Sequence, residues 1–274
     1  MFGLTFLNAT NKTTTHRVVP FKMGRLLGAI AGYVAGGNHS GGNVSGIIKV
    51  AFAADTLTTL SATLTTAREA PVGFANSGVA GYVAGGYDSA PISGIDKVSF
   101  SADTKTTLSA TLTTARYAMA GFANSGTAGY VAGGVDSGGN VSGIDKVSFS
   151  ADTKTTLSAT LTTARGYAAG FANSGTAGYV AGGVDPANVS GIDKIAFSAD
   201  TKTTLSATLT TARNSLTGFA NSGVAGYAAG GNDSGGKVSG IDKIAFSADT
   251  KTTLSATLTT AREVPAGFAN SGTI

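Results

Sequence analysis

A repeated hexapeptide is the feature that most restricts how this chain can fold. GYVAGG begins at Gly32, Gly81, Gly129 and Gly178, and it returns as GYAAGG at Gly226. The intervals are 49, 48, 49 and 48 residues, so five near-identical units occupy residues 32–274. Tandem units of this length are typical of solenoids and propellers. The fold therefore has to be inferred from the unit first.

Each unit holds four short segments that favour extended structure. In the second unit they are GYVAGG (81–86), IDKVSF (95–100), TTLSATL (106–112) and GFAN (121–124). Turn-forming Gly, Asp and Ser residues separate them, and no segment has helical periodicity. Four strands per roughly 48 residues is the spacing of propeller blades, whereas the coils of a β-solenoid are usually shorter. We predict an all-β fold, a five-bladed β-propeller with four antiparallel strands per blade.

The order of the segments predicts how the ring closes. GFAN precedes every hexapeptide except the first, and a last copy lies at residues 267–270. We expect this C-terminal strand to complete the first blade, because closure removes the exposed sheet edges at both ends. The predicted domains are a propeller over residues 32–274 and an N-terminal arm or attachment segment over residues 1–31.

The unit resembles the kelch repeat. The resemblance rests on a strand that ends in Gly85-Gly86, an aromatic residue in the next strand (Phe100) and an arginine after the fourth strand (Arg116). Kelch units usually have a tryptophan in the fourth strand, where this chain has leucine, and a tyrosine in the third, where it has phenylalanine. The resemblance implies a propeller of kelch-like repeats.

Two segments of the unit differ between copies. One follows the double glycine (38–43, 87–91, 135–140, 184–188, 232–237), and the other follows the arginine (69–72, 117–120, 166–169, 214–217, 263–266). In a four-stranded antiparallel blade both segments lie on the same face of the ring, which we call the variable face. Diversity on a uniform scaffold is typical of a binding surface, although loops also drift where nothing constrains them.

The candidate ligand-binding residues lie on the variable face. Tyrosines there would stack on sugar rings, anchor a protein partner or fill space near the ring axis. The aspartates suit turns better than calcium, because each loop offers one carboxylate. The candidates are Tyr87, Asp88, Tyr117, Met119, Asp136, Tyr167, Asp185, Asn214 and Asp233.

One arginine recurs in each unit, just before the second variable segment. A ring of arginines would bind an anion such as a phosphate or carboxylate. We favour a repeated hydrogen bond or ion pair to a neighbouring blade, because a ring selected for ligand binding is expected to lose its symmetry. These residues are Arg68, Arg116, Arg165, Arg213 and Arg262.

Composition limits the remaining chemistry. The chain has no cysteine, two histidines (His16 and His39) and none of the common nucleophile, metal or phosphate-binding motifs, so we expect no enzyme, no metal and no cofactor. A net charge of +4 is too diffuse to indicate nucleic-acid binding. No apolar run reaches the roughly 20 residues of a membrane span. Nothing marks a cellular location.

The sequence therefore predicts a non-enzymatic recognition module whose variable face contacts a glycan or a protein. The alternative is a structural component of a virion, such as a phage tail, fibre or capsid-associated protein, or of a surface appendage. In that case residues 1–31 would attach the protein or form a homo-oligomer.

Overall fold

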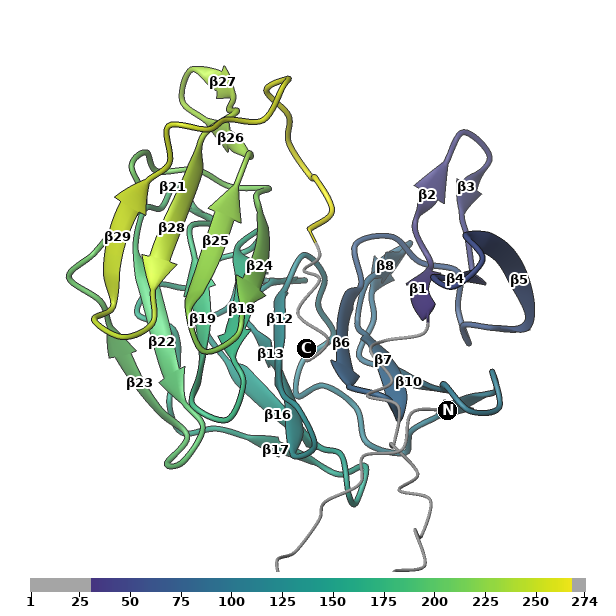
Figure 1. Cartoon of the computed structure of the whole chain (residues 1–274). Coiled ribbons are helices and arrows are strands. Elements are labelled where there is room, and N and C mark those ends of the chain that lie inside the picture. Colours follow the sequence, from purple (N-terminus) through teal and green to yellow (C-terminus); the bar gives the residue numbers. More distant parts are fainter. Residues whose placement is uncertain (1–30, 268–274) are drawn as a thin grey trace, which may run out of the picture.

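The structure, a computed structural model, describes residues 31–267, and within that range every regular element is a strand. Four four-stranded antiparallel sheets, one three-stranded sheet and several two-stranded hairpins follow one another along the chain (Figure 1). The all-β prediction is confirmed. The predicted N-terminal arm and closing strand lie outside the described residues, apart from Ala31 and Gly267.

We number the large sheets 1 to 5 in chain order. Sheet 1 consists of β1 (Ala31–Ala35), β4 (Gly46–Ala51) and β5 (Thr56–Thr63). Sheet 2 consists of β6 (Val72–Asn76), β7 (Ala80–Ala84), β10 (Ile95–Ser99) and β11 (Lys105–Thr107). Sheet 3 consists of β12 (Ala120–Asn124), β13 (Ala128–Ala132), β16 (Ile144–Ser148) and β17 (Lys154–Thr156).

The last two sheets repeat this order. Sheet 4 consists of β18 (Ala169–Asn173), β19 (Ala177–Ala181), β22 (Ile192–Ala196) and β23 (Thr201–Thr204). Sheet 5 consists of β24 (Thr217–Asn221), β25 (Ala225–Ala229), β28 (Ile241–Ala245) and β29 (Thr250–Thr253).

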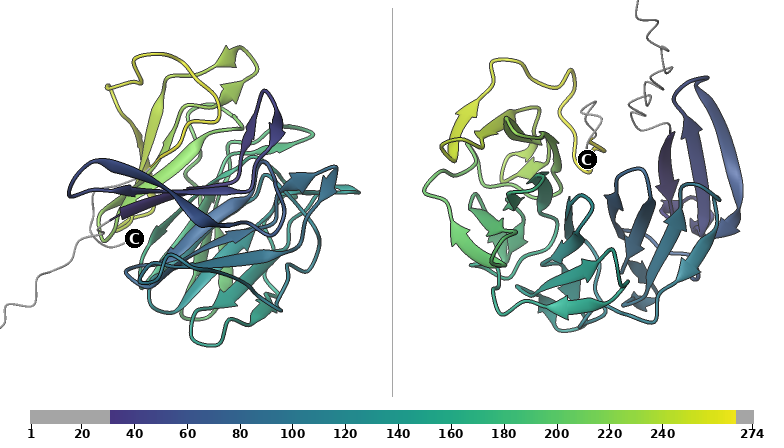
Figure 2. Two further views of the ribbon diagram at one scale, coloured as in Figure 1. Left: turned by 90° about the vertical axis from the view of Figure 1, so that its right-hand side faces the viewer. Right: turned by 60° about the horizontal axis from the view of Figure 1, so that its bottom comes forward.

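The first strands of sheets 2 to 5 lie next to one another. β12 contacts β6 and β18, and β18 contacts β24, although about 48 residues separate each pair in sequence. The sheets therefore follow one another around a common axis, with these strands innermost (Figure 2). The arrangement is propeller-like. Sheet 1 has three described strands and lacks an innermost strand among them.

The fourth strand agrees with its prediction in sheet 1, where β5 covers almost all of TTLSATL (58–64), but it is shorter in sheets 2 to 5. We expected it over TTLSATL (106–112), but β11 covers Lys105–Thr107 and ends before Leu108. The backbone N–H groups of Leu108 and Leu112 still donate to the carbonyls of Ile95 and Ser93. The rest of the segment follows the sheet without regular pairing, because its leucines turn into the space between sheets.

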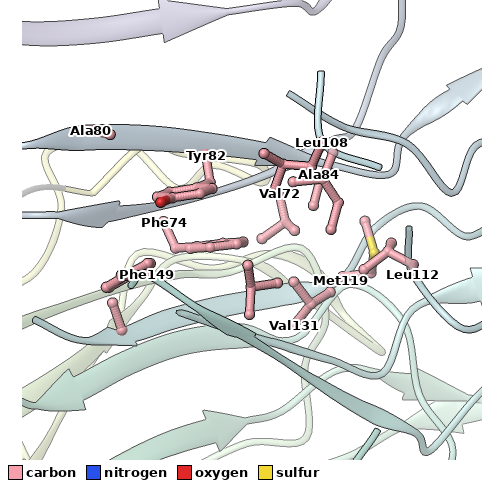
Figure 3. Close-up of a cluster of buried hydrophobic side chains, with 13 residues drawn as sticks. Val72, Phe74, Ala80, Tyr82, Ala84, Leu108, Leu112, Met119, Val131 and Phe149 are labelled. Carbon is pink, nitrogen blue, oxygen red and sulfur yellow. The ribbon is translucent and has the colours of Figure 1, made fainter. Parts of the chain in front are cut away.

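The contacts between consecutive sheets, which we call joints, form the core. In the joint between sheets 2 and 3, the rings of Phe74 and Tyr82 stack at 5.3 Å, and Phe149 of sheet 3 stacks on Tyr82 at 5.1 Å (Figure 3). Gly129 lies directly beneath the Phe74 ring, where a Cβ would come within 2.0 Å of a ring carbon. The repeated glycine of GYVAGG therefore lets neighbouring sheets approach closely.

Candidate functional site

The two kinds of variable segment meet on one face. Short hairpins follow the double glycines: β2 (Asn38–His39) with β3 (Gly42–Asn43), β8 (Tyr87–Asp88) with β9 (Ala90–Pro91), β14 (Val135–Asp136) with β15 (Gly139–Asn140), β20 (Val184–Asp185) with β21 (Ala187–Asn188), and β26 (Asn232–Asp233) with β27 (Gly236–Lys237). Isolated bridges join the residue after four of the five arginines to such a hairpin, as Glu69 to Tyr87 and Tyr117 to Val135. The predicted shared face is confirmed.

A ladder of backbone hydrogen bonds fixes the segments that follow the arginines. The N–H of Ala118 donates to the carbonyl of Ala70 at 3.1 Å, Tyr167 donates to Ala118 at 2.8 Å, and Ser215 donates to Tyr167 at 2.9 Å. Val264 continues the ladder by donating to Ser215 at 2.7 Å. All five residues have φ between 47° and 56°, a conformation that costs a non-glycine residue about 1 kcal/mol or more. The ladder was not predicted, because none of these residues is a glycine.

Three tyrosines from two neighbouring units gather on this framework. The rings of Tyr87 and Tyr117 lie 5.2 Å apart edge to face, and Tyr117 and Tyr167 lie 6.4 Å apart in the same manner. Tyr167 is 38% exposed, and the other two are half-buried. Burial, with smaller contributions from Tyr117 and Glu69, raises the pKa of Tyr167, so its phenol stays neutral at physiological pH. We call these residues the tyrosine cluster.

Met119 is a different case. It was a candidate contact residue, but its side chain is buried and packs with Leu112 in the joint between sheets 2 and 3 (Figure 3). It therefore belongs to the core rather than to the exposed surface.

The polar candidates on the variable face hold the loops. Asp136 and Asp233 accept hydrogen bonds from the backbone N–H groups of Gly138 and Gly235, at 2.7 and 2.8 Å. Asp88 and Asp185 accept from asparagine side chains of the preceding units, Asn43 and Asn140. Asn214 donates to Asn188 at 2.6 Å. Within residues 31–267 no cluster of potential metal ligands occurs. The hydrogen bonds of Asp136 and Asp233 within their own loops support the interpretation of these aspartates as turn-forming residues.

Four of the five repeated arginines are buried ion-pair partners. Each is at most 2% exposed and forms an ion pair with an aspartate of the next sheet, as Arg116 does with Asp145 at 2.9 Å. The other pairs are Arg68–Asp96 at 2.5 Å, Arg165–Asp193 at 3.0 Å and Arg213–Asp242 at 3.2 Å. The favoured structural interpretation is confirmed for these four, and they are too buried to bind an external anion. Arg262 is exposed, and its Nε donates to the carbonyl of Thr260.

The aspartates of these pairs are further stabilised by threonines. Asp96 accepts from the backbone and hydroxyl of Thr65 and from the hydroxyl of Thr107, at 2.7 to 3.0 Å. Burial by itself would raise the pKa of Asp96, but these hydrogen bonds and the charge of Arg68 outweigh it and leave the pKa below its ordinary value. The network therefore joins two sheets through one ionised carboxylate.

The turns of the opposite face also connect neighbouring sheets. Asp152 accepts from the Tyr82 hydroxyl at 2.9 Å and from Lys97 Nζ at 2.7 Å, and the same arrangement recurs at Asp103, Asp200 and Asp249. Asn76, at the end of β6, accepts from the backbone N–H of Gly126 in the turn after β12. These contacts explain why the opposite turns are nearly identical between units. The contrast in variability is therefore no longer, by itself, an argument for binding.

Two open hollows lie away from the tyrosine cluster. One of about 720 Å³ lies between residues 106–113 and residues 151–154, and a second of about 520 Å³ occupies the equivalent place between residues 206–210 and 248–251. Their recurrence in two units and their lining of threonine, serine and alanine indicate a feature of the repeat rather than a single dedicated pocket.

No known family model matches this chain, and no curated protein is significantly similar to it. In the part of the chain that the structure describes, no helix is long and apolar enough to cross a membrane.

Proposed function

We propose that this protein is a non-enzymatic recognition module that binds a glycan or a protein through its variable face, with the tyrosine cluster as the anchor. The carrying observation is that Tyr117 lies between Tyr87 of its own unit and Tyr167 of the next unit, with ring centroids 5.2 Å and 6.4 Å from its own. Exposed tyrosines offer flat apolar area and a hydroxyl at little conformational cost, and aromatic anchors dominate many interfaces.

The backbone ladder supports the same proposal. It holds the segments of Tyr117 and Tyr167 in register through the Ala118 carbonyl and the Tyr167 N–H, 2.8 Å apart. A preorganised aromatic surface loses less conformational entropy on binding than a flexible loop does.

We further propose that the scaffold is a closed five-bladed propeller of kelch-like units, completed by the C-terminal strand. The support is the position of Gly267. A Cβ on Gly267 would meet Thr217 and Phe219 of β24, much as one on Gly218 would meet Gly170 and Phe171 of β18. Gly267 thus lies beside β24 where a further innermost strand would begin, and in the proposed ring that strand would complete sheet 1.

A glycan array with purified protein tests the recognition proposal. We expect replacement of all three cluster tyrosines by alanine to weaken binding about 30-fold or more, as loss of an interface anchor does. Replacement by phenylalanine retains the rings and should preserve most of the affinity if stacking dominates.

The matched control is a Val79→Ala, Val224→Ala variant, since both valines are more than half exposed in turns of the opposite face. It should bind like the wild type. Equal binding by the triple alanine variant contradicts the proposed anchor, and an array without any bound glycan contradicts glycan recognition.

A further inference from the structure

Sheet 1 has an uncovered apolar face. Val34, Phe52 and Leu57 are 60%, 54% and 65% exposed. The equivalents of the first two in sheet 3, Val131 and Phe149, are 0% and 7% exposed because they pack against sheet 2. Among the described residues no sheet precedes the face of sheet 1 that corresponds to this contact, and no other element covers it.

Sheet 5 has the complementary open face at the other end of the series. Phe219 and Tyr227 stack at 5.2 Å and are half-buried, whereas their equivalents Phe122 and Tyr130 are buried. At the joint between sheets 3 and 4, a phenylalanine of the next sheet, Phe197, completes the stack at 5.0 Å from Tyr130. Among the described residues no third ring stacks on the pair in sheet 5. Phe52 of sheet 1 is the equivalent of Phe197.

The charges of the two open faces also match. At the other joints a lysine of one sheet pairs with an aspartate in a turn of the next, as Lys194 does with Asp249 at 2.7 Å. The equivalent lysine of sheet 5 is Lys243, and the equivalent aspartate of sheet 1 is Asp55. Asp55 is exposed and has φ 49°, close to the 53° of Asp249, so its turn already has the conformation that the contact uses.

We propose that the open face of sheet 1 docks on the open face of sheet 5 of the same chain, through Phe52 and an Asp55–Lys243 ion pair. Two observations favour sheet 5 as the partner of sheet 1. The contact would continue the series of four joints between consecutive sheets, and Gly267 lies against β24, where the missing strand of sheet 1 is expected. The inference rests on the proposed closed ring but not on the proposed ligand.

This joint differs from the others in one respect that the sequence records. The first unit has Ile48 and Leu57 where the second has Asp96 and Lys105, and Asp96 binds both Arg68 and Lys105. The aspartate that pairs with the buried arginine and the lysine that pairs with the same aspartate are thus both replaced by aliphatic residues. Arg262 consequently has no carboxylate to meet at this joint and stays at the surface. An apolar joint without a buried ion pair therefore closes the ring.

Zero-length carbodiimide cross-linking of the wild-type protein tests the proposal, because it joins a lysine amine to a carboxylate that touches it. The expected new link is Asp55–Lys243, within the monomer and with a yield within about threefold of the internal controls. Those controls are the four ion pairs Lys49–Asp103, Lys97–Asp152, Lys146–Asp200 and Lys194–Asp249, each 2.7 Å long. The tryptic peptide that carries Asp55 (residues 50–68) occurs once in the chain, so mass spectrometry identifies the link.

Two outcomes overturn the proposal. Formation of the control links without Asp55–Lys243 shows that the two faces do not meet. An Asp55–Lys243 link confined to the cross-linked dimer shows that a second copy covers each face instead. Neither result depends on ligand binding, so failure here is distinguishable from failure of the recognition proposal.

Discussion

At the scale of single residues, Arg116 and Arg262 occupy equivalent positions in the unit but different environments. Arg116 is buried and bonded to Asp145, whereas Arg262 is exposed. The sequence allowed two interpretations of the repeated arginines, an anion-binding ring and a structural contact between blades, and it favoured the second. It did not show that the fifth arginine lacks such a partner in the described structure.

We predict that Arg116→Leu destabilises the protein by about 3–5 kcal/mol, because it leaves the carboxylate of Asp145 buried without its cation. Arg262→Leu is the matched control and should leave the free energy of unfolding almost unchanged. Urea denaturation of the two variants measures the difference. Equal losses in both variants would show that the burial of Arg116 contributes nothing specific.

The contacts within the tyrosine cluster could not be predicted from the individual residues. Tyr87, Tyr117 and Tyr167 were singled out because they occur only in variable segments, but nothing in their spacing shows that their rings touch. Contact between them arises because consecutive segments are held together by the backbone ladder. Met119 was grouped with them for the same reason, yet it points into the core.

At the scale of elements, the glycines of GYVAGG explain how closely strands of neighbouring sheets approach. Gly129 in β13 lies under the ring of Phe74, and the ring occupies the space that a Cβ atom at this position would need. The repetition of this glycine was visible in the sequence, and the aromatic ring above it was not.

Gly129→Ala should therefore destabilise the protein by about 1–3 kcal/mol, the usual cost of overpacking a core. Gly46→Ala is the control, since Gly46 also lies in a strand, its φ is not positive and nothing lies within 4 Å of an added Cβ. Thermal unfolding of both variants checks the prediction. A Gly46→Ala effect as large as that of Gly129→Ala contradicts it.

Strand prediction was most accurate where alternation and turns agree. GYVAGG, IDKVSF and GFAN all form strands, with bounds within a few residues of those expected. The fourth strand reaches its predicted length only in sheet 1 and ends earlier in sheets 2 to 5, where leucines such as Leu108 and Leu112 fill the joint. The two-stranded hairpins after the double glycines were not predicted, since the sequence there is short and polar.

At the scale of the whole molecule, the joints have one feature in common, which is that each contains ionised aspartates. Hydrogen bonds and the charge of a neighbouring arginine, opposed by burial, leave the pKa values of Asp96 and Asp242 below the ordinary 3.8. At Asp103 the hydrogen bonds from Lys49 and then Tyr33 lower the pKa. These carboxylates therefore bind protons more weakly in the folded than in the unfolded protein.

Because the pKa values of these aspartates are lower in the folded than in the unfolded protein, we predict that acid destabilises the fold. The stabilisation is fully present above the unfolded-state pKa of about 3.9, and it is lost as the pH falls below that value through the lower folded-state pKa values. We expect a melting temperature that is nearly constant between about pH 5 and pH 7 and that falls steeply below about pH 4. Calorimetry across this range measures it, and a melting temperature unchanged at pH 2 would contradict the role of these joints.

The sequence by itself determined the unit, the order of its strands, the all-β class and the placement of both variable segments on one face. Those properties follow from local hydrogen-bonding geometry and from alternation along each strand, which the order of residues encodes directly. Only the tertiary structure decided that four of the five arginines are buried, that three tyrosines meet and that the turns of the opposite face connect sheets. These depend on distances between residues that lie 25 to 70 positions apart, and such distances are set by how closely the sheets pack.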